Sequence, residues 1–133
     1  MKNIEELIKE AIMVKEKAHC PNSNYQVGAA LETKSGKVYT GCNIENYGIQ
    51  SICAERVAFA KAISEGETEF IRIVVVGGPK EEKMVLTTPC GYCRQFMSEF
   101  VQKDFEVILF WDNLQNIKKY SIGELLPHSF ELK

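Results

Sequence analysis

The strongest constraint on how this chain folds is a pair of cysteine groups, each placed where a helix is expected to begin. Cys53 precedes an apolar segment with helical spacing, and Pro89-Cys90-Gly91-Tyr92-Cys93 opens a second one. Three thiolates suit zinc, and three protein ligands leave one coordination position for water. If the two groups share one ion, the fold has to bring the starts of both helices together.

Glu55 lies two residues after the first cysteine, where its carboxylate can sit beside the open position without binding the metal. The pattern C-x-E followed by P-C-x-x-C matches the signature of zinc nucleoside and nucleobase deaminases. In that chemistry, zinc activates water for attack on an amino-bearing ring carbon, and the glutamate moves protons. The residues therefore predict a hydrolytic deaminase with Cys53, Cys90 and Cys93 as zinc ligands and Glu55 as the catalytic residue.

Composition limits the other possibilities. The chain has 133 residues, of which 45% are apolar and 26% charged, so a single catalytic domain over residues 1–133 is expected. A net charge of −2 disfavours a nucleic-acid partner. The N-terminal segment has neither the apolar core of a signal peptide nor the length of a membrane span, so no membrane partner is expected. Five cysteines without a disulfide pattern fit the reducing cytoplasm.

Hydrophobic periodicity predicts strands that alternate with helices, which implies a mixed sheet with helices on both faces. Residues 54–64 are apolar on several sides, so that helix is expected to be buried. The β-branched run 71–76 has the character of a central strand covered on both faces. The expected helices are 4–18, 54–64, 90–101 and a short one after Ser121, and the expected strands are 25–31, 38–42, 71–76, 106–111 and 117–120.

Three thiolates make the site anionic, which would leave the bound water less acidic than neutral ligands would. Arg56 and Arg94 each lie within three residues of a predicted zinc ligand. Either guanidinium could donate to a ligand sulfur and withdraw charge. Ordinary salt bridges on helix surfaces are the alternative for both.

A structural zinc site is the competing interpretation of the cysteines. It would need a fourth ligand, which Cys20 or Cys42 could supply. Glu55 has no use in such a site, and a chain this apolar does not need a metal to fold, so catalytic zinc is favoured. Cys20 and Cys42 are expected to be buried small hydrophobes, and His19 and His128 to have no metal role.

The chain resembles the small homotetrameric cytidine deaminases of pyrimidine nucleoside salvage. The similarity lies in five blocks that occur in the family's order: Val27-Gly28-Ala29-Ala30, Gly41 to Asn46, Cys53-Ala54-Glu55-Arg56, Pro89 to Gln95 and Leu125-Leu126-Pro127. The resemblance implies an α/β fold, a three-layer α/β/α domain around a five-stranded mixed sheet. It also implies conversion of cytidine and deoxycytidine to uridine and deoxyuridine in a homotetramer with shared active sites.

The resemblance further implies roles for single residues. The backbone at Ala54 would read the base edge, and Asn43 and Glu45 would hold the ribose 3′-hydroxyl; a turn after a strand is the alternative for the latter two. Tyr25 matches a phenylalanine that packs against the base, and Phe130 matches a C-terminal aromatic that reaches a neighbouring subunit's site. Core packing is the alternative for both rings.

The sequence departs from the family's pattern at two places. Asn22 replaces a common tyrosine, and the segment 47–52 is one residue shorter than in the family. Deamination of another cytosine-bearing small molecule, such as blasticidin S, is the second enzymatic interpretation, although Asn43 and Glu45 favour a plain ribose. A non-enzymatic zinc module that binds a protein or RNA is a third possibility, which Glu55 and the acidic charge oppose.

Overall fold

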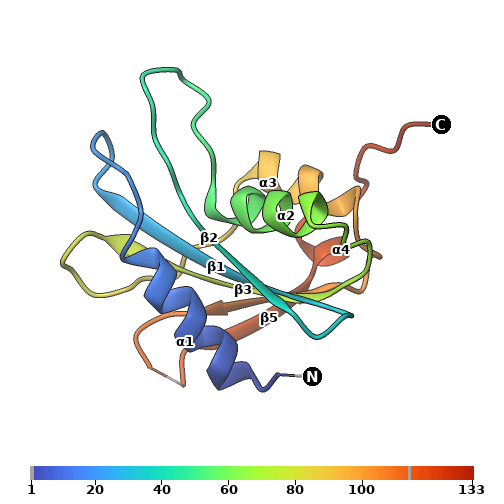
Figure 1. The fold of residues 1–133 in the computed structure, drawn as a ribbon, viewed down its shortest axis with the longest axis horizontal. Coiled ribbons are helices and arrows are strands. Elements are labelled where there is room, and N and C mark those ends of the chain that lie inside the picture. Colours follow the sequence, from blue (N-terminus) through green and yellow to red (C-terminus); the bar gives the residue numbers. More distant parts are fainter. Residues whose placement is uncertain (1, 114) are drawn as a thin grey trace.

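The protein is described by a computed structural model covering residues 2–113 and 115–133. Five strands form one sheet in the order β2-β1-β3-β4-β5 (Figure 1). Only β3 and β4 run parallel, and the other neighbours are antiparallel. The predicted five-stranded mixed sheet is confirmed. The strands are β1 (Tyr25–Thr33), β2 (Val38–Cys42), β3 (Phe70–Pro79), β4 (Glu106–Phe110) and β5 (Ile117–Ser121).

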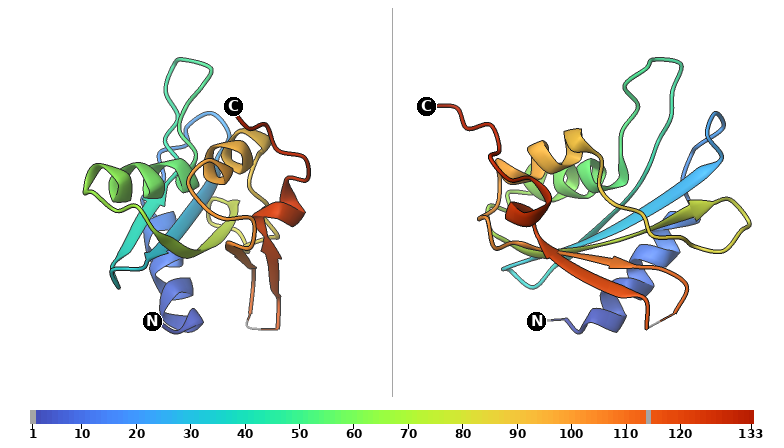
Figure 2. Two further views of the ribbon diagram at one scale, coloured as in Figure 1. Left: turned by 90° about the vertical axis from the view of Figure 1, so that its right-hand side faces the viewer. Right: turned by 180° about the vertical axis from the view of Figure 1, so that it is seen from behind.

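Helices cover both faces of the sheet, which completes the three layers. Helix α1 (Ile4–Lys15) lies on one face, and α2 (Ala54–Ser64) and α3 (Gly91–Ser98) lie on the other (Figure 2). The short helix α4 (Ile122–Leu125) follows its N-cap Ser121, whose side chain forms a capping box with that of Glu124. This layering puts the N-termini of α2 and α3 on the same side of the sheet.

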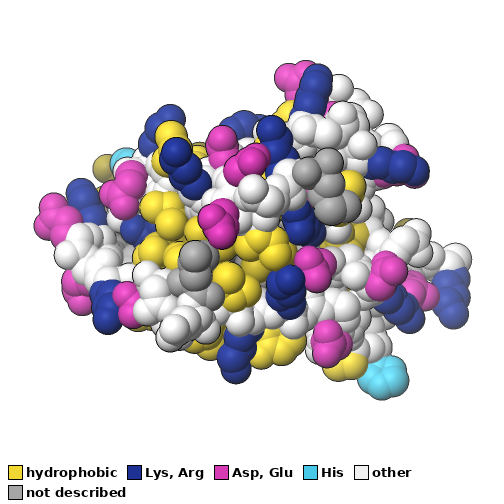
Figure 3. Space-filling view, turned by 90° about the horizontal axis from the view of Figure 1, so that it is seen from below, with side chains coloured by type: hydrophobic (Ala, Val, Ile, Leu, Met, Phe, Trp, Pro, Cys, Tyr) yellow, Lys and Arg dark blue, Asp and Glu magenta, His cyan; other side chains and the backbone are white. Residues whose placement is uncertain are grey.

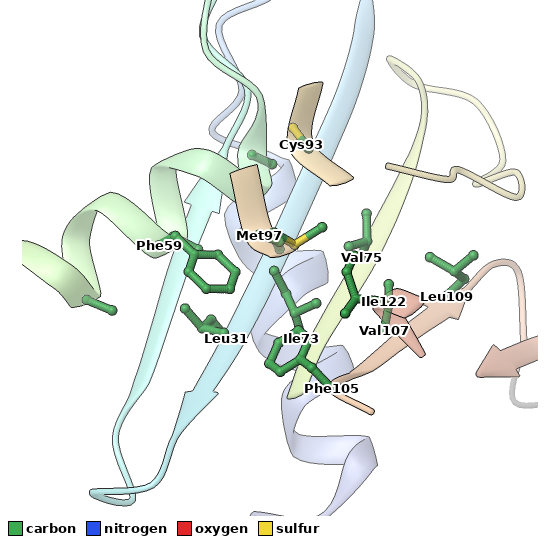
Figure 4. Packing of buried hydrophobic residues seen from close by; sticks show 14 residues of the cluster. Leu31, Phe59, Ile73, Val75, Cys93, Met97, Phe105, Val107, Leu109 and Ile122 are labelled. Carbon is green, nitrogen blue, oxygen red and sulfur yellow. The ribbon is translucent and has the colours of Figure 1, made fainter. Parts of the chain in front are cut away.

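The core has two parts because β3 is buried on both of its faces. Ile73 and Val75 point toward α2 and α3, where they join Phe59 and Met97 (Figure 4). The alternate residues of the same strand, Val74 and Val76, pack with α1. Side chains of successive strand residues point to opposite faces, so an unbroken β-branched run is what a strand between two helical layers needs.

Two glycines allow the helices to approach the sheet closely. A Cβ at Gly41 of β2 would lie 2.4 Å from the Ala54 carbonyl oxygen, and one at Gly28 of β1 would lie 2.1 Å from that of Ala11. Both neighbours are backbone atoms, which cannot rotate away. Gly41 therefore fixes how closely the first turn of α2 sits on β2.

The helix boundaries agree with expectation for α2 and are shorter for α1 and α3. Residues 16–18 leave the α-helix in a turn, in which Lys17 and Ala18 donate to carbonyls three residues earlier. Helix α3 ends at Ser98 rather than residue 101. Burial of α2 is less complete than expected, since Ala60 and Lys61 face outward.

Two features of the described residues concern the membrane and nucleic-acid partners that the sequence disfavours. Among residues 2–113 and 115–133, no helix has the length and apolar character needed to cross a bilayer. On the face shown in Figure 3, hydrophobic side chains gather near the middle and acidic and basic groups are scattered around them. That face offers no continuous basic strip for a phosphate backbone.

Candidate zinc site and substrate pocket

Three cysteine sulfurs come together where α2 and α3 begin. Cys53 is the N-cap of α2 and Cys90 is the N-cap of α3, while Cys93 lies in the first turn of α3. Their sulfur atoms all lie within 4.8 Å of one another. The Cys90 sulfur also accepts from the Cys93 backbone N–H at 3.4 Å. Helix N-termini present unpaired N–H groups and a positive dipole end, and both favour thiolates at this point.

The spacing of the sulfurs fits zinc. Cys53 and Cys90 Sγ are 3.8 Å apart. Two thiolates bound tetrahedrally to zinc at about 2.3 Å are separated by about 3.8 Å. Within the described part of the chain, neither Cys20, Cys42 nor a histidine joins this cluster. The donor set therefore fits one zinc ion with a coordination position left open.

Neighbouring donors stabilise the Cys53 thiolate. Hydrogen bonds from the Cys93 thiol, and then from the Arg56 guanidinium and Cys90, lower the pKa of Cys53 to about 5 despite partial burial. The same S–H donation to Cys53, together with burial, raises the pKa of Cys93. Metal binding requires every ligating thiol to be deprotonated, so part of that requirement is met before a metal arrives.

The two arginines near the cysteines have different partners. Arg56 Nη2 donates to Cys53 Sγ at 3.6 Å. Within the described residues, Arg94 makes neither the sulfur contact nor the salt bridge considered for it, because its guanidinium is directed at backbone carbonyls instead. Arg94 Nε donates to the Pro89 oxygen at 2.7 Å and Nη1 to the Leu125 oxygen at 2.8 Å. Arg94 thus ties the segment before Cys90 to α4.

Glu55 lies beside the sulfurs and lines the same cavity as Cys53 and Cys90. It is only 3% exposed, and burial raises its pKa to about 7. It lies in the first turn of α2, directly after buried Ala54. A carboxyl group with a pKa near neutrality can both accept and donate protons at physiological pH.

A cavity of about 240 Å³ opens beside the sulfurs. It brings together six residues that the sequence had singled out. They are Asn43, Glu45, Cys53, Ala54, Glu55 and Cys90. This volume is slightly below the range of about 300–1,000 Å³ that is typical of pockets for drug-sized ligands, so the cavity suits a small molecule.

Asn43 and Glu45 are held by the strand and loop around them. Asn43 Oδ1 accepts from the Val27 N–H at 2.8 Å and its Nδ2 donates to the Tyr25 oxygen at 2.8 Å. Glu45 Oε1 accepts from the backbone N–H groups of Asn22 and Ser23 at 2.7 and 3.2 Å. Hydrogen bonding from Ser23 and these backbone groups lowers the pKa of Glu45. The side chains are therefore oriented while each keeps hydrogen-bonding capacity.

Tyr25 and Phe130 are not among the residues that line the cavity. The Tyr25 hydroxyl is hydrogen-bonded to Thr87 Oγ1 at 2.6 Å, which satisfies the extra polar group that tyrosine brings. The Phe130 backbone exchanges two hydrogen bonds with the Gln95 side chain, while the Phe130 ring is 67% exposed. The Tyr25 side chain thus reaches the cavity wall through Thr87.

Several residues that line the cavity were not among the site residues predicted from the sequence. Val27, Ser51, Ile52, Thr87 and Thr88 also line the cavity. The two threonines could have been predicted from the sequence, because they come directly before Pro89-Cys90 and must therefore lie close to that ligand. For Ser51 and Ile52, the sequence indicated only that their loop is unusual in length.

A buried carboxyl group beside three thiolates, without a fourth protein ligand, is the arrangement of a zinc enzyme; a structural zinc site closes its coordination with four ligands. Comparison with known proteins identifies the family. Residues 1–109 match the model of the cytidine and deoxycytidylate deaminase zinc-binding region. The chain belongs to this family.

Individual relatives agree over nearly the whole chain. A cytidine deaminase from Halalkalibacterium halodurans is 47% identical over 127 residues, which are 93% of this chain and 91% of that protein. The crystal structure of cytidine deaminase from Burkholderia pseudomallei has a TM-score of 0.84 and 41% identity, covering 97% of this chain and all of that one. A blasticidin-S deaminase from Bacillus cereus is 32% identical over 111 residues, 80% of this chain and 77% of that protein.

Proposed function

We propose that this protein is a cytidine deaminase that converts cytidine and deoxycytidine to uridine and deoxyuridine with release of ammonia. The observation that carries the proposal is the buried Glu55 carboxyl, which lines the cavity beside Cys53 and Cys90. Relatives named cytidine deaminase, at up to 47% identity, support the substrate. The blasticidin-S deaminase is more distant at 32%, and no feature of this pocket favours its substrate.

Cys53, Cys90 and Cys93 would hold the zinc ion. When bound, zinc supplies a Lewis acid that makes water ionise near neutral pH. Glu55 moves both protons of the attacking water. It gives one to ring N3, where that proton stays in the product, and the other to the amino nitrogen, which leaves C4 as ammonia. A group with a pKa near 7 suits both transfers.

The remaining pocket residues would orient the nucleoside. Ala54 begins α2, so its backbone amide is one of the helix donors without an intrahelical partner and would read the base edge. Asn43 and Glu45 would bind the ribose 3′-hydroxyl. The backbone N–H groups of Asn22 and Ser23 both donate to Oε1 of Glu45, which leaves Oε2 to accept from the sugar. Tyr25 would support the base side of the pocket through Thr87.

We further propose a homotetramer in which neighbouring chains complete each other's active sites. The loop between β2 and α2 and the C-terminal tail both extend away from the body of the chain (Figure 1 and Figure 2). Tyr47 and Ile49 on that loop are fully exposed, and Leu132 on the tail is 90% exposed. Apolar side chains exposed on extended segments are typical of surfaces that a partner covers. Phe130 would then enter a neighbour's pocket.

Residues 1–133 would act as a single catalytic domain, because both core clusters pack on one sheet. The five cysteines are free, which suits a cytoplasmic protein of pyrimidine nucleoside salvage.

The direct test is to incubate purified protein with cytidine, deoxycytidine, free cytosine and blasticidin S, and to measure ammonia and the deaminated product for each. We expect the two nucleosides to be converted with the highest kcat/KM. A higher value for blasticidin S would assign the alternative substrate. No conversion of any of the four by zinc-loaded protein would refute deaminase activity.

A further inference from the structure

Tyr92 lies between the two cysteines of the second metal-binding group, and its ring faces Arg56. The Arg56 guanidinium carbon is 4.1 Å from the centre of that ring. This distance is well inside the range of about 6 Å over which a cation is attracted to an aromatic face. The two residues come from different helices, since Arg56 is on α2 and Tyr92 on α3. Their contact therefore bridges the helix starts that carry the cysteines.

The guanidinium of Arg56 has few other partners to orient it. Its Nη2 donates to Cys53 Sγ at 3.6 Å. Its Nε is buried and has no hydrogen-bond partner in the described part of the chain. Arg94, by contrast, is fixed by two short hydrogen bonds to carbonyl oxygens. Long contacts to sulfur do not hold an arginine side chain in one geometry, so the ring supplies a further constraint.

We propose that Tyr92 is a positioning residue of the zinc site, which holds the Arg56 guanidinium against the Cys53 sulfur by stacking its ring on it. The contact with Arg56 is made by the face of the Tyr92 ring and not by its hydroxyl. The proposal rests on the zinc site of the proposed function, but not on the identity of the substrate.

Loss of the ring has a defined consequence. Arg56 would be free to turn toward water, and the Cys53 sulfur would lose a charged donor. A sulfur without that donor carries more negative charge beside two other thiolates, and groups that orient and neutralise metal ligands contribute to metal affinity. A cation–aromatic contact of this kind corresponds to a roughly three- to tenfold effect on the affected equilibrium or rate.

The test compares Tyr92→Leu, which removes the aromatic face, with Tyr92→Phe, which removes only the hydroxyl. Zinc release from the intact protein to an excess of a chromophoric chelator is followed for both, and for Arg56→Gln and the double variant Arg56→Gln/Tyr92→Leu. We expect roughly three- to tenfold faster release from Tyr92→Leu, wild-type release from Tyr92→Phe, and no further acceleration when Tyr92→Leu is added to Arg56→Gln.

A second readout is the sulfur-to-metal charge-transfer band of the cobalt-substituted protein. It should move to lower energy in Tyr92→Leu and stay in place in Tyr92→Phe, because only the first leaves the Cys53 sulfur more electron-rich. If Arg56→Gln does not fold, the shift of this band in Tyr92→Leu still tests whether the ring positions Arg56.

Three results would overturn the proposal: wild-type zinc release and an unshifted band in Tyr92→Leu, equal changes in Tyr92→Leu and Tyr92→Phe, or additive effects in the double variant. Wild-type protein that binds no zinc would refute the proposed function as well, whereas zinc-loaded wild type with an unaffected Tyr92→Leu variant refutes only the role of Tyr92.

Discussion

Two parts of the pocket wall are built in different ways. At the metal end, the cysteines and Glu55 lie at the starts of two helices that pack on the sheet, and Glu55 is almost completely buried. Another part of the wall, Ser51 and Ile52, belongs to an extended loop on which Tyr47 and Ile49 are fully exposed. The predicted zinc ligands and Glu55 thus meet within one chain, while the loop beside them exposes apolar side chains.

Backbone constraints explain the contrast. The metal end is fixed by the close approach of α2 to Gly41 and by helix N-termini that favour thiolates. The projecting loop is tied at its base by the backbone pair Ile44 and Ile52, whose two hydrogen bonds are each 2.9 Å long. We therefore expect substitutions at the metal end to act within each chain, and substitutions in the projecting loop to act through a neighbouring chain.

The largest effect should come from Glu55. Replacing Glu55 by Gln keeps the shape of the buried side chain but removes its proton transfer, so kcat should fall about 10²- to 10⁴-fold while zinc is retained. Metal analysis and cytidine turnover on the same sample measure both. Glu65→Gln, at the exposed end of the same helix, is the matched control and should behave as wild type. Loss of zinc in Glu55→Gln would mean that Glu55 supports the metal instead.

A substitution at Phe130 tests whether another chain completes the pocket. Phe130→Ala removes the exposed ring but keeps the backbone contacts with Gln95, and kcat/KM should fall about ten- to a hundredfold. Mixing it with Glu55→Gln under conditions that exchange subunits should restore activity, because a mixed site draws Glu55 from one chain and Phe130 from the other. A mixture no more active than its parts after proven exchange would rule out shared sites.

Glu45 tests the sugar contact. Glu45→Ala should reduce kcat/KM for cytidine about tenfold, and should affect an analogue that lacks the 3′-hydroxyl much less. Glu45→Gln keeps an oxygen for the Asn22 and Ser23 N–H groups and therefore controls for loosening of that loop. Equal losses for both substrates would remove Glu45 from the ribose site.

A pair of glycines tests the rigidity contrast itself. Gly41→Ala forces a Cβ to within 2.4 Å of a backbone oxygen of α2 and should lower the free energy of unfolding by about 1–3 kcal/mol. A Cβ at Gly48, on the projecting loop, would lie 3.4 Å from the nearest atom, which is a side-chain nitrogen of Asn46. Gly48→Ala should therefore change the free energy of unfolding by less than about 0.5 kcal/mol. Urea unfolding measures both. Similar values for the two variants would contradict the contrast.

The sequence predicted the parts of the molecule that depend on local pattern. The bounds of α2 and the burial of β3 on both faces follow from periodicity and from a β-branched run. The meeting of Cys53 with Cys90 followed from chemistry, because three thiolates at two helix starts are of use together only if they converge.

Contacts between distant side chains could not be predicted in this way. Arg94 turns to the Pro89 and Leu125 carbonyls because α4 folds back beside α3, and spacing from a cysteine does not reveal that. The partner of the Tyr25 hydroxyl, Thr87, is likewise set by the return of the chain past the end of β3. The stacking of Tyr92 on Arg56 depends on how two helices are placed relative to each other.

The most direct test of the account is to titrate zinc in one purified sample while cytidine turnover is measured. Zinc is removed with a chelator and returned stepwise, and metal content and ammonia release are recorded at each step. The account predicts turnover that rises in proportion to zinc and levels off at one ion per chain, as the three-cysteine cluster requires. Turnover that persists without metal, or that stays absent at full occupancy, would contradict it.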